Sequence, residues 1–180
     1  MRIISHTFGK FPEIEHLNPQ FIPGRTKQKI TIDVYSSAEK FKAIYHKLNE
    51  EVHQLFPTIL RHDCGKPANN VRRKGPFHPY QGVIDVIHVI EHIMIDMMCH
   101  ITDLTICSGI TCHWWEPNNR FDIFVESTDQ KASRFAAYYA TSLVKDMLKN
   151  NQIDEKFHVL LNDMKSTFSQ PPAYAQAVNF

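Results

Sequence analysis

The sequence lacks a long uninterrupted hydrophobic run, and it carries no excess of either charge. Its longest apolar stretch, residues 83–98, is interrupted by acidic residues and histidines, which excludes an ordinary membrane span. The formal net charge is only +1, far from the basic balance of a nucleic-acid-binding domain. The first residues contain no apolar core of signal-peptide length. We therefore expect a cytoplasmic protein with neither a nucleic acid nor a membrane as its partner.

Cysteine is also scarce. The four cysteines have neither the spacing of a disulfide framework nor an export signal beside them, so we expect reduced thiols. Histidine, in contrast, is abundant, with 11 residues in a chain of 180. Because imidazole is the commonest metal ligand among side chains, this count favours a metal site.

The hydrophobic pattern predicts both strands and helices, without an internal repeat. Alternating or β-branched stretches favour strands at 1–8, 29–35, 104–115 and 120–127. Apolar residues at helical spacing favour helices at 36–56, 82–106, 129–149 and 153–168. Composition favours loops at 9–29 and 61–81 and an extended tail at 169–180. We predict one α+β domain over residues 1–180, in which a small, mostly antiparallel sheet packs against a buried helix and further helices.

The predicted helix at 82–106 carries a polar seam along an otherwise apolar run. Its ionisable residues, mostly three or four positions apart, are Asp85, His88, Glu91, His92, Asp96, His100 and Asp103. Residues at this spacing share one face of a helix. Buried ionisable groups are costly unless they are compensated. A bound divalent metal ion would compensate them, and an ordinary satisfied polar seam between two helices is the alternative.

His88-Val89-Ile90-Glu91-His92 is the reversed form of the zinc-protease helix motif. It places two imidazoles one turn apart as metal ligands, with Glu91 beside them as a general base for a metal-activated water. Catalytic zinc has three protein ligands, and Glu126, at the end of a predicted strand, is our candidate for the third. Asp96 or Asp85 would hold a ligand imidazole by its second nitrogen.

Other polar residues are candidates for the substrate site. Arg72 and Arg73 would bind a substrate carboxylate through the guanidinium fork, or they belong to a solvated loop. Arg134 would reach the site or lie on a helix surface. His100 would stabilise an oxyanion or form a polar wall. The aromatic stretch at residues 113–115 would line a cleft or pack on the sheet.

Three stretches follow one another with the order and gaps of a known domain. They are His88-Val89-Ile90-Glu91-His92, Ile123-Phe124-Val125-Glu126 and Ser133-Arg134-Phe135-Ala136-Ala137. Together they resemble the N-terminal domain of cyanophycin synthetase, which has a His-x-x-Glu-His helix, a Val-Phe-Glu-Tyr strand and a helix with Arg-Tyr-Ala-Ala. The resemblance covers roughly residues 28–150, and Gly109-Ile110-Thr111 stands where the family has Gly-Arg-Thr.

This resemblance implies a zinc metallopeptidase that cleaves its polymer internally. It assigns zinc ligation to His88, His92 and Glu126, and the role of the base to Glu91. The sequence departs from the family at Ile110, where the family has Arg, and at Ile87, where it has Gly. The ATP-dependent ligase domains of the synthetase are absent from the sequence. These departures leave the substrate open among peptide, isopeptide and cyanophycin-like amides.

The leading hypothesis is therefore a zinc-dependent hydrolase of amide bonds. The first alternative is a non-catalytic binding or assembly module in which the seam only holds the fold together. The second alternative is a structural metal site with four filled positions. Aromatic residues in the predicted hairpin and prolines in the tail also favour a homodimer.

Overall fold

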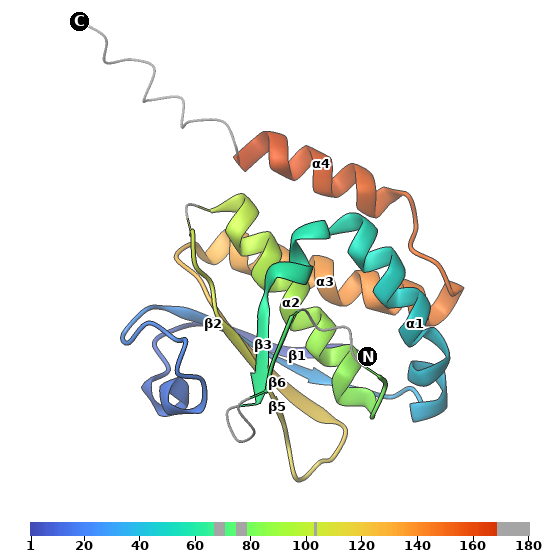
Figure 1. Cartoon of the computed structure of the whole chain (residues 1–180), viewed down its shortest axis with the longest axis horizontal. Coiled ribbons are helices and arrows are strands. Elements are labelled where there is room, and N and C mark those ends of the chain that lie inside the picture. The colour runs from blue at the N-terminus through green and yellow to red at the C-terminus, as the bar shows by residue number, and fades with distance from the viewer. Residues whose placement is uncertain (67–70, 75–78, 103, 169–180) are drawn as a thin grey trace, which may run out of the picture.

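A four-stranded antiparallel sheet forms one layer of the protein (Figure 1). A computed structural model describes residues 1–66, 71–74, 79–102 and 104–168, with the backbone alone for 63–66, 71–74 and 165–168. In the order β1-β2-β6-β5, the strands are Arg2–Gly9, Lys27–Asp33, Arg120–Glu126 and Gly109–His113. Strand β5 therefore lies at one edge of this sheet.

Four α-helices form the second layer, with α2 in its centre (Figure 1). Their bounds are Ala38–Leu55 for α1, Val83–Ile101 for α2, Gln130–Asn150 for α3 and Lys156–Phe168 for α4. Two 3-10 segments connect strands and helices, η1 at Pro12–Leu17 and η2 at Pro57–Arg61. After η2, the chain forms a separate two-stranded sheet of β3, Asp63–Lys66, and β4, Val71–Lys74.

The two faces of the main sheet belong to different apolar clusters, because successive strand residues point to opposite faces. Ile123 and Val125 of β6 pack with the helices in the main core. Phe124, between them in sequence, packs on the opposite face against Ile14 and Phe21. The segment that contains η1 covers that opposite face and completes the smaller cluster.

Helix α2 is hydrophobic around most of its circumference, as expected for a helix enclosed by its neighbours. It packs against α1, α3, α4, β5 and β6. At its start, the Asp85 carboxylate accepts hydrogen bonds from the backbone N–H groups of Gln81 and Gly82. This contact caps the N-terminus and places the carboxylate near the positive end of the helix dipole.

The structure confirms the α+β class and the predicted β5–β6 hairpin. It contradicts the prediction of a loop throughout 61–81, since β3 and β4 lie within that segment. Parts of that segment, 67–70 and 75–78, lie outside the described residues, as do Asp103 and the tail at 169–180. Among the described helices, none has the length and apolar character needed to cross a membrane.

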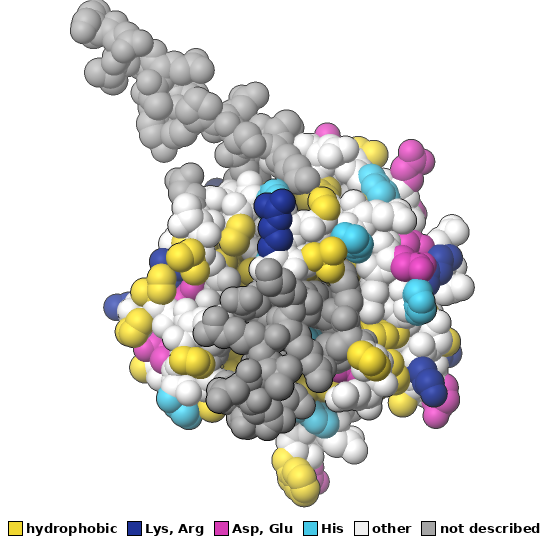
Figure 2. Space-filling model, in the orientation of Figure 1, with side chains coloured by type: hydrophobic (Ala, Val, Ile, Leu, Met, Phe, Trp, Pro, Cys, Tyr) yellow, Lys and Arg dark blue, Asp and Glu magenta, His cyan; other side chains and the backbone are white. Residues whose placement is uncertain are grey.

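Charged side chains are scattered over the described surface in Figure 2 and form no extensive patch of one sign. This scatter is consistent with a formal net charge of only +1. The described part of the face shown therefore has no basic patch to which a polyanion such as a nucleic acid would bind.

Candidate metal centre

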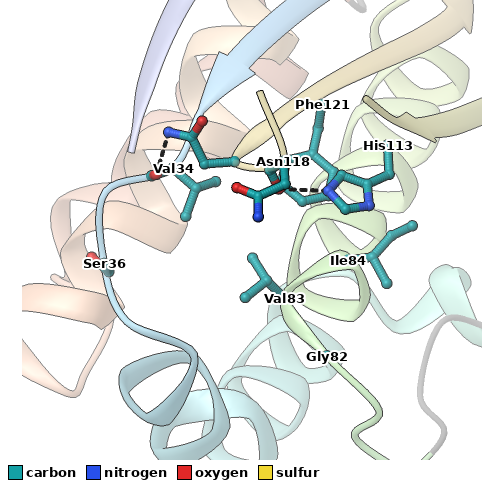
Figure 3. A pocket seen from close by; sticks show the side chains of 9 residues that line it. Val34, Ser36, Gly82, Val83, Ile84, His113, Asn118 and Phe121 are labelled. Carbon is teal, nitrogen blue, oxygen red and sulfur yellow. Dashed lines mark hydrogen bonds between the residues drawn. The ribbon is translucent and has the colours of Figure 1, made fainter. Parts of the chain in front are cut away.

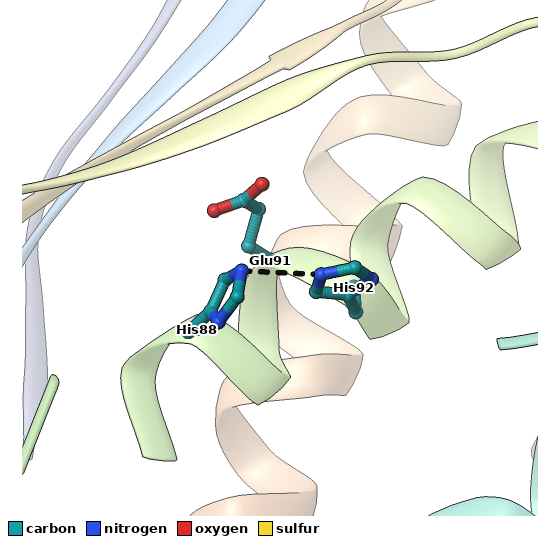
Figure 4. Close-up of side chains that lie close together, drawn as sticks. All are labelled: His88, Glu91 and His92. Carbon is teal, nitrogen blue, oxygen red and sulfur yellow. Dashed lines mark hydrogen bonds between the residues drawn. The ribbon is translucent and has the colours of Figure 1, made fainter. Parts of the chain in front are cut away.

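Two imidazoles face one another on α2. His88 and His92 are one helical turn apart, and their Nε2 atoms are 3.1 Å apart (Figure 4). Together with Glu91 they form the group of described residues whose ligand atoms all lie within 4.8 Å of one another. His88 is half-buried, whereas Glu91 and His92 are buried. His88 is thus the partly accessible member of the group.

The spacing of the two nitrogens fits a zinc ion. Tetrahedral zinc with Zn–N bonds of about 2.05 Å places two ligand nitrogens about 3.3 Å apart. The observed separation of 3.1 Å is close to that value. Histidine nitrogens are also common ligands in catalytic zinc sites.

The Glu91 carboxyl lies beside the histidine pair and is turned toward the sheet (Figure 4). Its Oε2 accepts a hydrogen bond from Thr111 Oγ1 of β5 at 2.5 Å. Burial raises the pKa of Glu91 to about 7, although the Thr111 hydrogen bond opposes this rise. A carboxyl with this pKa can both accept and release a proton near neutral pH, as an acid–base catalyst must.

Gly109 allows β5 to approach α2 closely. A Cβ atom at this position would lie 2.9 Å from the Phe124 carbonyl oxygen and 3.0 Å from Glu91 Oε1. Any larger residue would therefore displace the strand or the Glu91 carboxyl. The glycine belongs to the Gly109-Ile110-Thr111 stretch, whose outer residues both lie beside Glu91.

A chain of close polar contacts connects His92 to a buried carboxylate. His92 Nδ1 lies 3.2 Å from His62 Nδ1, and the two rings are stacked. His62 Nε2 lies 3.1 Å from Asp96 Oδ1, which also accepts a hydrogen bond from Thr58 Oγ1 at 2.6 Å. Asp96 is only 2% exposed, so these contacts compensate its burial.

The protons along this chain can be assigned if His92 Nε2 binds a metal. The His92 ring proton then resides on Nδ1 and is donated to His62 Nδ1. The His62 ring proton then resides on Nε2, which lies 3.1 Å from Asp96 Oδ1. In this arrangement, the contact with His62 supports the orientation of the His92 ring.

His62 was not among the residues predicted for the site. We expected Asp96 to hold a ligand imidazole directly, but in the structure His62 lies between Asp96 and His92. His62 follows η2, well before the motif in sequence, and no spacing rule relates it to α2. Only the packing of η2 on α2 places it there.

The structure does not bring Glu126 to the histidine pair. Its side chain is on the same face of β6 as Phe124, opposite to the face on which α2 packs. There it accepts hydrogen bonds from the backbone N–H groups of Ile22 and Ser108 and pairs with Arg25. Glu126 is therefore not a member of the group of described residues that could hold a metal ion, whose third member is Glu91.

Two other predicted residues occupy structural positions on their helices. His100 Nδ1 contacts Asp96, one turn before it, and lies beyond His92 along α2. Asp85, the alternative support for an imidazole, accepts backbone hydrogen bonds at the start of α2. Both residues belong to the predicted seam, but neither joins the metal group of the described residues.

The predicted arginines are not shown to contact the histidine pair. Arg72 and Arg73 lie in β4, and their side chains are outside the described part of the structure. Arg134 is exposed on α3. Burial lowers the pKa of His6 in β1, and the charge of Arg134 lowers it further. Because β1 and β5 are at opposite edges of the sheet, Arg134 lies away from the β5 side, where Thr111 contacts Glu91.

Comparison of the chain with protein-family models finds no match, and comparison with curated proteins finds no significant relative.

Proposed function

We propose that this protein is a zinc-dependent hydrolase of amide bonds. One observation carries the proposal: an imidazole pair with ligand spacing lies beside a buried carboxyl whose pKa is raised to about 7. The resemblance to the N-terminal domain of cyanophycin synthetase supports the same proposal.

His88 and His92 would hold the zinc ion, with further ligands not assigned. When bound, zinc supplies an electrophile for the substrate carbonyl and lowers the pKa of water. Glu91 accepts a proton from the attacking water and returns it to the leaving amine. Thr111 holds one oxygen of Glu91 and so orients the carboxyl for this transfer.

His62 and Asp96 act on the site through His92. They hold the His92 ring in the orientation and protonation state that leave Nε2 available as a ligand. The partial exposure of His88 provides the approach for a substrate. Peptides and isopeptides are both substrates of this class, and a cytoplasmic location accords with the free thiols of Cys99, Cys107 and Cys112.

The test compares zinc content and peptide hydrolysis for the wild type, Glu91→Gln and Glu50→Gln. Glu50 is exposed on α1, so its substitution is the matched control. We expect Glu91→Gln to retain zinc and to lose turnover by about 10²- to 10⁴-fold, because it removes the proton acceptor. Full activity of Glu91→Gln would refute this role, and loss of zinc would make Glu91 a ligand instead. A wild type that binds no zinc would favour the non-catalytic module.

A further inference from the structure

Strand β5 has one edge that no other described strand occupies. In an antiparallel pair, alternate residues direct both backbone groups to the partner strand. Trp114 N–H donates to Arg120 O at 2.9 Å, and Glu126 N–H donates to Ser108 O at 2.8 Å. These two bonds show which residues of β5 direct their backbone groups toward β6 and which direct them away from it. The residues whose backbone groups point away from β6 are therefore Gly109, Thr111 and His113.

Part of this outward edge is occupied. Asn18 Nδ2 donates to the Gly109 carbonyl oxygen at 2.7 Å. Within the described parts of the chain, no residue hydrogen-bonds to the outward backbone groups of Thr111 and His113. Thr111 is partly exposed and His113 is exposed. Exposed backbone groups at a sheet edge are a template on which another extended chain can pair.

The open part of the edge runs beside the candidate base. Thr111, which contributes two outward backbone groups, also contacts Glu91 through its side chain at 2.5 Å. A strand paired with β5 would lie about 4.8 Å from it. The peptide bonds of such a strand would thus run past Glu91.

A pocket of about 330 Å³ continues the same region toward the start of α2 (Figure 3). Ile84 lines it on α2, one turn before His88, and His113 lines it on β5, two residues after Thr111. Its lining residues are Val34, Ser36, Gly82, Val83, Ile84, His113, Asn118, Asn119 and Phe121. None of these described residues is acidic, lysine or arginine. The His113 ring stacks on Phe121, and His113 Nε2 forms a hydrogen bond with the Asn118 carbonyl oxygen at 2.6 Å.

We propose that β5 binds the substrate as an extended, α-linked peptide that adds a strand to the sheet, with an apolar side chain in this pocket. A substrate residue opposite His113 would point its side chain to the same face as the His113 ring, which lines the pocket. The bond opposite Thr111 would then lie next to Glu91. This proposal rests on the proposed hydrolase function and names its substrate class.

The same geometry selects against isoaspartyl polymers. Strand pairing requires hydrogen-bonding groups at a strict two-residue repeat. A β-linked aspartyl residue adds a methylene to the backbone and breaks that repeat. The uncharged lining also offers no partner for an arginine or aspartate side chain.

The binding test uses the fluorescence of Trp114 and Trp115, the two tryptophans of the chain, which directly follow β5. Zinc-loaded Glu91→Gln is titrated with a short acetylated alanine peptide that has one central leucine, and with versions N-methylated at each position in turn. We expect weaker binding, by roughly tenfold, at every second position, because only alternate amides face β5. The proposal would be overturned if methylation had the same effect at every position. It would also be overturned if an isoaspartyl peptide bound equally well, or if no α-peptide bound.

The pocket is tested by Ile84→Lys, with Val159→Lys on exposed α4 as the control. We expect Ile84→Lys to shift the preferred central residue from leucine to aspartate by roughly tenfold, and the control to keep leucine. An unchanged preference would exclude this pocket. Hydrolysis by the zinc-loaded wild type is measured separately. Binding with the alternating pattern but without hydrolysis refutes the proposed function, whereas hydrolysis without that pattern refutes the edge-strand proposal.

Discussion

At the residue scale, the environment of Glu91 links the site to the stability of the fold. Burial raises the pKa of its carboxyl from 4.5 to about 7. The unfolded chain therefore loses this proton at lower pH than the folded chain does. Folding stability from the protonated carboxyl is fully present below pH 4.5 and is lost as the pH rises through 7.

For metal-free protein, we expect this loss to be about 3 kcal/mol between pH 4 and pH 8, since each pKa unit corresponds to about 1.4 kcal/mol. Glu91→Gln has no ionisable group at this position and should not show this contribution. Urea unfolding of both proteins across this pH range measures the difference. A constant difference in the free energy of unfolding would show that the Glu91 pKa is not raised.

His62 gives a second prediction at this scale. His62→Phe keeps a ring beside His92 but removes both nitrogens from the connection to Asp96. Supporting contacts of this type change metal affinity by about 10- to 100-fold, so we expect zinc binding to weaken by that factor. His46→Asn, at an exposed position on α1, is the control and should bind zinc like the wild type. Equal affinities of all three proteins would exclude His62 from the site.

At the element scale, the approach of β5 to α2 depends on Gly109. We expect Gly109→Ala to lower the free energy of unfolding by about 1–3 kcal/mol, because the new methyl group overlaps a backbone oxygen and Glu91. Gly9→Ala is the matched control, since a Cβ there meets no atom within 4 Å. Denaturant unfolding of both variants gives the comparison. Equal stabilities would mean that β5 and α2 are not held at this distance.

The same elements explain how far the sequence could predict the site. His88, Glu91 and His92 lie on one helix, so the helical repeat alone brings them together. Glu126 was predicted as the third ligand because it ends a strand. Whether its side chain points toward α2, however, depends on which residues of that strand face the helices. The alternation of Ile123, Phe124 and Val125 puts it on the opposite face.

At the scale of the whole molecule, the α+β class and the order of most elements could be predicted, because they follow from local hydrophobic periodicity. The β3–β4 pair could not, since its residues show no alternation of apolar and polar side chains. Likewise, the contact of His62 with His92 depends on how η2 packs against α2. Local patterns do not contain that information.

The most direct test of the central claim is a calorimetric titration of metal-free, untagged protein with zinc, for the wild type and for His92→Ala. We expect about one equivalent of tightly bound zinc for the wild type, and loss of that binding in His92→Ala, whose fold circular dichroism should show to be retained. Absence of zinc binding by the wild type, or unchanged binding by folded His92→Ala, would contradict it.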